Sequence, residues 1–259
     1  MQSNWQSAVL RRRPQQAASA VVPALVVILA VLAVGVAPVA AKEVTFLERT
    51  VLFDPPKEVP VTGLLLWFHD GASQADIDAG WWHDRGVAQR GLAVVCPSKS
   101  EGQHDWVASD KLYAAQLVNH LCERFQLTTK QVIVGGAGSG AAFAQTIATS
   151  LQGSLCAGVL MVRSANRGPW REPTAAAPVF SIVANANDPH VPHESLRKVE
   201  RAMAQTGYQT TFSLGMAGGG MDNVVAESLV ALCQQLTIKL APGELIPVVP
   251  VDAVDLTAP

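Results

Sequence analysis

The sequence predicts an α/β protein with a doubly wound, mostly parallel sheet and helices on both faces. Two observations support this fold class. From residue 63 onward, short apolar runs alternate with longer amphipathic stretches. The runs show no alternation of apolar and polar residues, which is typical of parallel strands covered by helices on both faces. Strand–helix alternation of this kind favours a parallel sheet over a sandwich.

Five buried strands are expected along the chain, each ending at a polar, proline or glycine turn. They are residues 64–68, 92–96, 132–134, 157–162 and 179–184. An earlier segment, residues 43–53, is expected to supply one or two edge strands.

Apolar residues at three- and four-residue intervals predict helices between and after these strands. One such stripe comprises Leu112, Ala115, Val118, Cys122 and Phe125. A second comprises Leu196, Val199 and Met203, between Pro192 and Gly207. A last helix is marked by Val225, Leu229, Leu232 and Leu236.

The first 41 residues have the features of an export signal rather than of a globular core. Three arginines at 11–13 precede an uncharged apolar run at 20–37, and Val39 and Ala41 provide small residues before a cleavage point. This order is typical of a secretory signal peptide. The run is also near the lower length limit for a membrane span, so a retained signal anchor is the alternative. We expect a secreted or periplasmic protein, or a membrane-anchored one that faces outside the cytoplasm.

Residues 42–240 are expected to form one domain, followed by a Pro/Val-rich extension at 241–259. All acidic residues lie at or after Glu43, so the exported part is net acidic. This charge gives no basic patch for nucleic acid, and membrane contact is expected only if the N-terminal segment is retained. Four cysteines lie in separate apolar segments, at 96, 122, 156 and 233. Buried thiols are expected, with three disulfide pairings as the alternative in an oxidising compartment.

Three motifs follow the predicted strands: WFHDG at 67–71, VIVGGAGSGAAFA at 132–144, and NDPHVP at 187–192. With these motifs, residues 63–236 resemble the α/β-hydrolases, most closely the secreted esterases related to polyhydroxybutyrate depolymerase and dienelactone hydrolase. The resemblance implies the α/β-hydrolase fold and a serine nucleophile, with no cofactor and no metal.

The resemblance also implies an oxyanion loop at His69, Gly71 and Ala72, in which a backbone N–H of Gly71 or Ala72 donates to the substrate oxyanion. A nucleophile elbow needs small residues two positions before and after the nucleophile. If Gly136 and Gly140 are these residues, the nucleophile position falls on Gly138, which has no side chain. A shift of one residue would place Ser139 there instead. The length of the preceding strand favours Gly138.

Asp188 lies where these enzymes keep the acid of the triad, in the loop after the predicted strand at 179–184. The histidine should follow in the loop before the last helix, where the chain reads GMAGGGMDN at 215–223. Gly220 stands in its place, and no histidine follows His193. Because a serine hydroxyl is a weak nucleophile without a positioned base, the sequence predicts a degenerate triad of Gly138, Asp188 and Gly220. One alternative is a base relocated to another histidine, and a further alternative is a metal site formed by His190, His193 and Asp188.

These observations predict an exported, catalytically inactive protein that binds an unknown small molecule or protein at its cleft. The alternative is an active carboxylic-ester hydrolase that uses Ser139, Asp188 and a displaced histidine. A third hypothesis is a structural partner tethered to the membrane. Trp81, Trp82 and Trp106 are expected at the cleft rim, either lining a pocket or covering the sheet.

Overall fold

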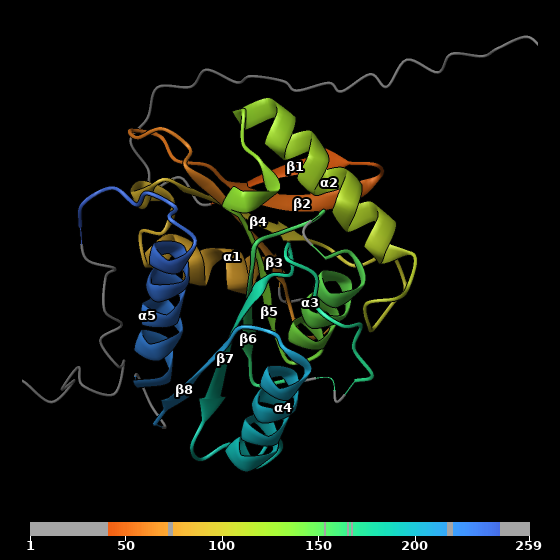
Figure 1. Cartoon of the computed structure of the whole chain (residues 1–259). Coiled ribbons are helices and arrows are strands. Elements are labelled where there is room, and N and C mark those ends of the chain that lie inside the picture. Colours follow the sequence, from red (N-terminus) through yellow and green to blue (C-terminus); the bar gives the residue numbers. More distant parts are fainter. Residues whose placement is uncertain are drawn as a thin grey trace, which may run out of the picture. The chain divides into compact units, whose positions relative to one another are not determined.

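An eight-stranded sheet organises the computed structural model, which describes residues 41–71, 75–152, 154–164, 166, 168–216 and 220–243 (Figure 1). The strand order is β1-β2-β4-β3-β5-β6-β7-β8. Strands β3 to β8 run parallel, whereas β1 and β2 are antiparallel to their neighbours. The predicted doubly wound, mostly parallel sheet is confirmed.

The five predicted central strands are confirmed. They are β3 (Gly63–Phe68), β4 (Leu92–Pro97), β5 (Val132–Ala137), β6 (Gly158–Val162) and β7 (Val179–Asn185). Nearly every residue in them is buried, which explains why their sequences show no alternation. Because they run in the same direction, the segments that follow them meet at one edge of the sheet.

The two ends of the sheet differ in how well the sequence predicts them. The segment at 43–53 forms β1 (Lys42–Phe46) and β2 (Arg49–Asp54), as expected. At the opposite end, β8 (Thr210–Gly215) pairs with β7 and was not predicted. Its residues are mostly half-buried or exposed, so it lacks the continuous apolar run that identifies the central strands.

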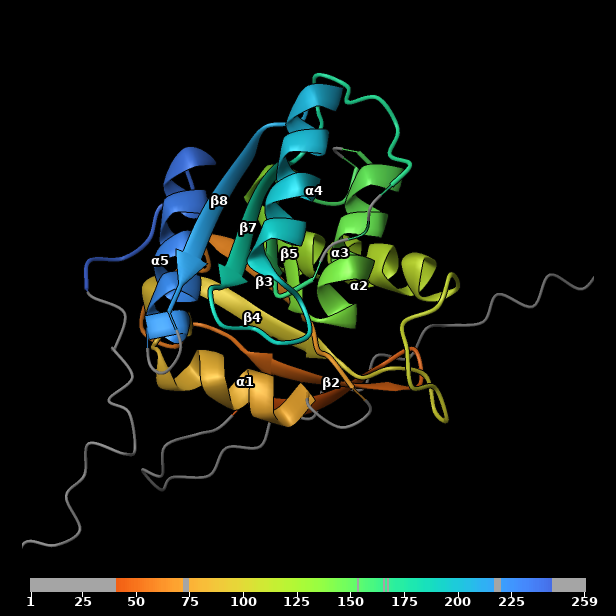
Figure 2. The same ribbon diagram turned by 90° about the horizontal axis from the view of Figure 1, so that it is seen from below.

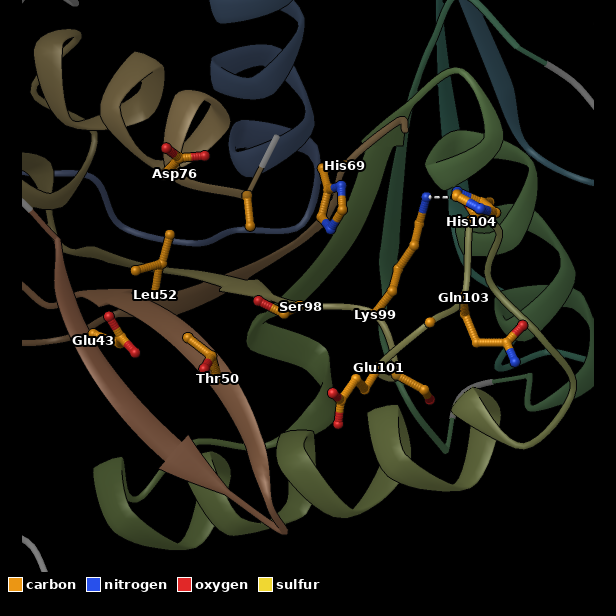
Figure 3. A pocket seen from close by; sticks show the side chains of 13 residues that line it. Glu43, Thr50, Leu52, His69, Asp76, Ser98, Lys99, Glu101, Gln103 and His104 are labelled. Carbon is orange, nitrogen blue, oxygen red and sulfur yellow. Dashed lines mark hydrogen bonds between the residues drawn. The ribbon is translucent and has the colours of Figure 1, made fainter. Parts of the chain in front are cut away.

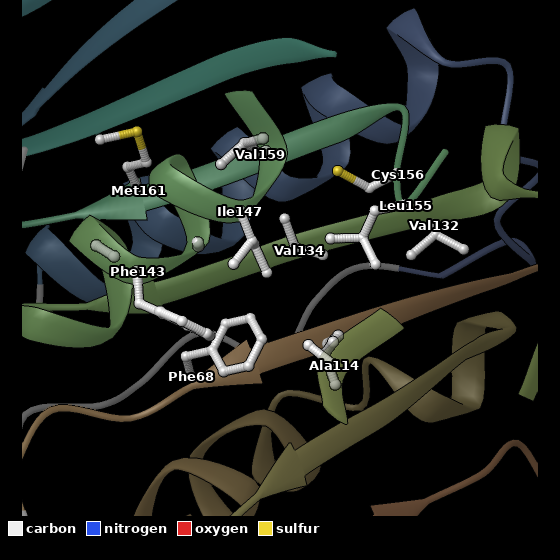
Figure 4. Close-up of a cluster of buried hydrophobic side chains, with 14 of the residues drawn as sticks. Phe68, Ala114, Val132, Val134, Phe143, Ile147, Leu155, Cys156, Val159 and Met161 are labelled. Atoms are coloured by element: carbon white, nitrogen blue, oxygen red, sulfur yellow. The ribbon is translucent and has the colours of Figure 1, made fainter. Parts of the chain in front are cut away.

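Helices cover both faces of the sheet (Figure 2). On one face, α2 (Asp110–Phe125), α3 (Ser139–Ser150) and α4 (His193–Thr206) enclose a cluster that includes Phe68, Phe143 and Met161 (Figure 4). On the other face, α1 (Ala75–Asp84) and α5 (Gly220–Gln235) enclose a cluster that includes Trp82 and Leu229. Two short 3₁₀ helices, Ala88–Arg90 and Thr129–Gln131, lead into β4 and β5.

The predicted helical stripe is confirmed for α4 and in part for α2, where Val118 and Cys122 are buried. Leu196, Val199 and Met203 are the buried residues of α4, which ends at Gly207 with a φ of 104°. In α2, Leu112 is 66% exposed, and the buried face instead includes Tyr113, Ala114 and Leu117. The buried face starts at Asp110, which accepts a hydrogen bond from Arg49 of β2 at 2.6 Å.

Two predictions from the sequence lie largely outside the described residues. The apolar segment at 20–37 and most of the extension at 241–259 belong to the parts that the structure does not describe. Within the described ranges, every helix is too short or too polar to cross a bilayer. The domain boundaries therefore stay a prediction. All four cysteines are described, and they are buried free thiols.

Candidate active site

The sharp turn between β5 and α3 is built by three glycines at alternate positions. Gly138 joins the strand to the helix with φ 52° and ψ −125°, a conformation that side chains rarely adopt. Gly136 and Gly140 lie against the end of β3, where a Cβ on either would overlap the carbonyl oxygen of Phe68. Ser139 is the first residue of α3. The tip of this turn is therefore a glycine, and the serine is one residue further on.

The carboxylate of Asp70 occupies the space in front of this tip. Its Oδ1 accepts hydrogen bonds from the Ser139 backbone N–H at 3.1 Å and from the Ser139 hydroxyl at 2.9 Å. It also accepts from the Gly71 N–H at 3.1 Å. A Cβ built on Gly138 would overlap Oδ2 of the same carboxylate. An acidic side chain of the protein thus stands where a nucleophile and its oxyanion would be.

The predicted oxyanion loop is only partly described. Gly71 is exposed and donates to Asp70, whereas Ala72 lies outside the described residues. His69 is buried at the end of β3, and its backbone oxygen accepts a hydrogen bond from the indole of Trp106 at 3.0 Å. The two N–H groups that face the Gly138 tip, those of Gly71 and Ser139, already have an acceptor.

Asp188 follows β7 and is buried, with 1% of its side chain exposed. Its Oδ2 accepts from Nε of Arg163 at 2.5 Å, and Oδ1 accepts from the backbone N–H groups of His190 and Val191. Burial raises the pKa of this carboxyl, but these hydrogen bonds outweigh burial and lower its pKa to about 2. Asp188 is therefore ionised, and its partners are an arginine and backbone groups.

The position predicted for the histidine has no imidazole in the described part of the chain. Gly220 is the first residue of α5, and residues 217–219 lie outside the described ranges. All six histidines of the chain are described, and none hydrogen-bonds to Ser139. His83 pairs with Asp54 and His193 with Glu194, while His190 is exposed. No group of three metal-binding side chains occurs among the described residues.

Solved structures with a similar fold identify the fold of this chain. The chain is similar to TT1662 from Thermus thermophilus, with a TM-score of 0.57 and 17% identity over 78% of this chain and 98% of that one. It is also similar to Thermogutta terrifontis esterase 2, with a TM-score of 0.54 and 15% identity over 79% and 97%. This chain has the α/β-hydrolase fold.

A thermostable esterase has the same fold, with a TM-score of 0.55 and 13% identity. This chain covers 63% of that longer protein, and 78% of this chain is matched. At these identities the likeness shows the fold alone. No protein-family model matches the chain, and no curated protein sequence matches it.

The tryptophans expected at the cleft rim cover the sheet. Trp82 is fully buried against Trp67 and Trp81. Trp106 stacks on Phe143, with ring centroids 5.3 Å apart, and contacts the edge of Phe68. Neither Trp82 nor Trp106 lines the cavity of about 540 Å³ that lies beside His69.

The sequence predicted no role for Asp70 or Arg163. In the structure, Asp70 accepts a hydrogen bond from Ser139, and Arg163 donates one to Asp188. Asp70 lies within a quoted motif, and its place directly after a central strand is a signal that it belongs to this edge of the sheet. Arg163 also follows a strand directly, and it has a φ of 56°. No local spacing pattern in the sequence predicts its ion pair with Asp188.

Proposed function

We propose that this protein is an α/β-hydrolase-fold protein without hydrolytic activity, which functions by binding a small molecule or another protein. One observation carries the proposal. The Asp70 carboxylate fills the position of the nucleophile beside Gly138 and accepts hydrogen bonds from two backbone N–H groups that face it. A negatively charged side chain at this position repels the oxyanion that ester hydrolysis must form.

The other predicted catalytic residues do not supply the missing chemistry. The Ser139 hydroxyl donates to Asp70 and has no histidine to take its proton. Asp188, which would orient that histidine, is bound by Arg163 and two backbone N–H groups. Because the members of a catalytic triad act as a unit, loss of the base alone costs orders of magnitude in rate.

We further propose that the protein acts outside the cytoplasm. This part of the proposal is supported by the basic, apolar and small-residue order of residues 1–41. N-terminal sequencing of exported material tests it. A new N-terminus at Lys42 is the expected result. An intact N-terminus on membrane-bound material would support the tethered alternative.

A fluorophosphonate probe and a panel of short-chain aryl esters test the loss of activity. We expect no labelling and no turnover above that of Ser139→Ala. Ser154→Ala, in which an exposed serine is removed, is the matched control. Turnover that Ser139→Ala abolishes and Ser154→Ala retains would overturn the proposal. It would support the alternative of an ester hydrolase that uses Ser139, Asp188 and a displaced histidine.

A further inference from the structure

The cavity of about 540 Å³ lies beside His69, the residue that follows β3 (Figure 3). Its lining includes neither Gly138 nor Asp70. Its walls come from the β1 and β2 strands, the start of α1 and the loop at 98–104 that follows β4. Sites for small molecules typically have volumes of about 300–1,000 Å³. The cavity is thus large enough for a ligand and separate from the space that Asp70 fills.

His69 supplies a hydrogen-bonding atom without a partner at this cavity. The residue is 2% exposed, and its ring points into the space that the lining residues surround (Figure 3). Its Nδ1 lies 3.4 Å from the carbonyl oxygen of Asp70. A carbonyl oxygen only accepts, so Nδ1 carries the ring hydrogen and Nε2 presents a lone pair. Nε2 is buried and has no hydrogen-bond partner in the described part of the chain.

The unpartnered atom therefore needs a donor. Burial lowers the pKa of His69, which keeps the ring neutral near pH 7. A buried acceptor without a donor is energetically unfavourable. A ligand N–H group that reaches Nε2 removes this cost.

The charges around the cavity favour a positively charged ligand. Three carboxylates line it, those of Glu43, Asp76 and Glu101. Lys99 also lines it, but its buried ammonium already donates to the carbonyl oxygens of Gly71 at 2.6 Å and His104 at 2.7 Å. The lining is therefore net acidic.

We propose that this cavity binds a small organic cation with ammonium groups, such as a polyamine. An ammonium N–H donates to Nε2 of His69, and the carboxylates of Glu43, Asp76 and Glu101 balance the charge. The hydroxyl groups of Thr50 and Ser98, which also line the cavity, are further hydrogen-bonding groups. This inference rests on the proposed binding function, for which it names the site and the ligand class.

Calorimetric titration of the whole protein with putrescine and spermidine tests the proposal, together with long-range ¹H–¹⁵N NMR of the histidine rings. We expect saturable binding and a shift of the Nε2 resonance of His69. 1,4-Butanediol has the length of putrescine but no charge, and we expect it to bind at least tenfold more weakly. Binding should also weaken with added salt, because the carboxylates are partly exposed to solvent.

Three variants distinguish binding at this site from general attraction to an acidic protein. The double substitution Glu43→Gln and Glu101→Gln changes exposed side chains only, so folding is preserved and affinity should fall at least tenfold. Glu227→Gln, an exposed carboxylate on α5, is the matched control and should not change affinity. His69→Leu removes the acceptor and should also weaken binding.

Two outcomes would overturn the inference: no saturable binding of either amine, or equal weakening by the double variant and by Glu227→Gln. Failure here is distinct from failure of the proposed loss of activity. If neither amine binds and the protein does not react with fluorophosphonate, only the proposed cation site is excluded. Labelling of Ser139 contradicts the proposed inactivity and leaves the titration result standing.

Discussion

His69 and Asp70 are neighbours in sequence, yet their side chains have opposite environments. The Asp70 carboxylate fills its space and accepts three hydrogen bonds at Oδ1. The His69 ring borders a cavity of about 540 Å³, and its Nε2 has no partner among the described residues. At the same edge of the sheet, a side chain therefore fills the nucleophile position of this fold, whereas a cavity remains beside His69.

Gly138→Ser places a hydroxyl at the nucleophile position. It is the strongest test of whether the Asp70 carboxylate blocks that position. We expect the free energy of unfolding to fall by about 3 kcal/mol, since the new Cβ combines backbone strain with overlap on Asp70. No esterase activity should appear. Denaturant unfolding measures the loss of stability.

A matched control separates the strain from the overlap. Gly102 also has a positive φ, of 74°, but a Cβ there meets open space. Gly102→Ser should therefore cost only roughly 1–2 kcal/mol. Adding Asp70→Gly to Gly138→Ser should recover the difference. If the two single variants are equally stable, the Asp70 carboxylate moves aside easily and the site is not closed.

A smaller effect is expected from Asp188→Asn, which tests whether this carboxylate now has a structural role. Its folded pKa of about 2 lies below the usual value of about 3.9. The carboxylate therefore stabilises the protein above about pH 4, and this contribution is lost as the pH falls toward about 2. We expect the variant to unfold more easily by about 1–2 kcal/mol at pH 7.

Thermal unfolding at pH 7 and at low pH measures this dependence. The difference between Asp188→Asn and the unchanged protein should shrink as the pH falls. Asp76→Asn removes an exposed carboxylate and should show a much smaller difference at pH 7. A difference for Asp188→Asn that is the same at every pH would exclude the ionised Arg163–Asp188 pair as its cause.

The smallest effect on stability is expected from His69→Leu, at the residue that borders the cavity. The ring makes one long hydrogen bond and leaves Nε2 unpaired, so an apolar side chain of similar volume should change the free energy of unfolding by less than about 1 kcal/mol. Denaturant unfolding without ligand measures this change. A loss above about 2 kcal/mol would show that the imidazole stabilises the fold through a contact unrelated to binding.

The central strands could be predicted because burial on both faces leaves a continuous apolar run, as in β3 and β4. Strand β8 could not, because its exposed edge position weakens that signal. The first turn of the buried face of α2 was misplaced because Leu112 is apolar but exposed, whereas Asp110 is charged but buried.

The residues of the candidate site also differ in how well the sequence predicts them. The three glycines of the turn after β5 are readable from their spacing, because backbones that nearly touch exclude side chains at fixed intervals. The contact between Asp70 and Ser139 joins residues 69 positions apart, and that between Arg163 and Asp188 joins different strand ends. Such pairings depend on how loops meet in space, so the local sequence does not reveal them.

The edge position of β1 has a consequence for how the cavity opens. Among the described strands, β1 pairs only with β2, and four of its five residues are exposed. Segments with few buried contacts open locally without unfolding the rest of a domain. A molecule held between Glu43 on β1 and His69, which follows β3, would fasten this hairpin to the sheet. Slower amide hydrogen exchange in residues 42–46 would then report occupancy directly, without any catalytic readout.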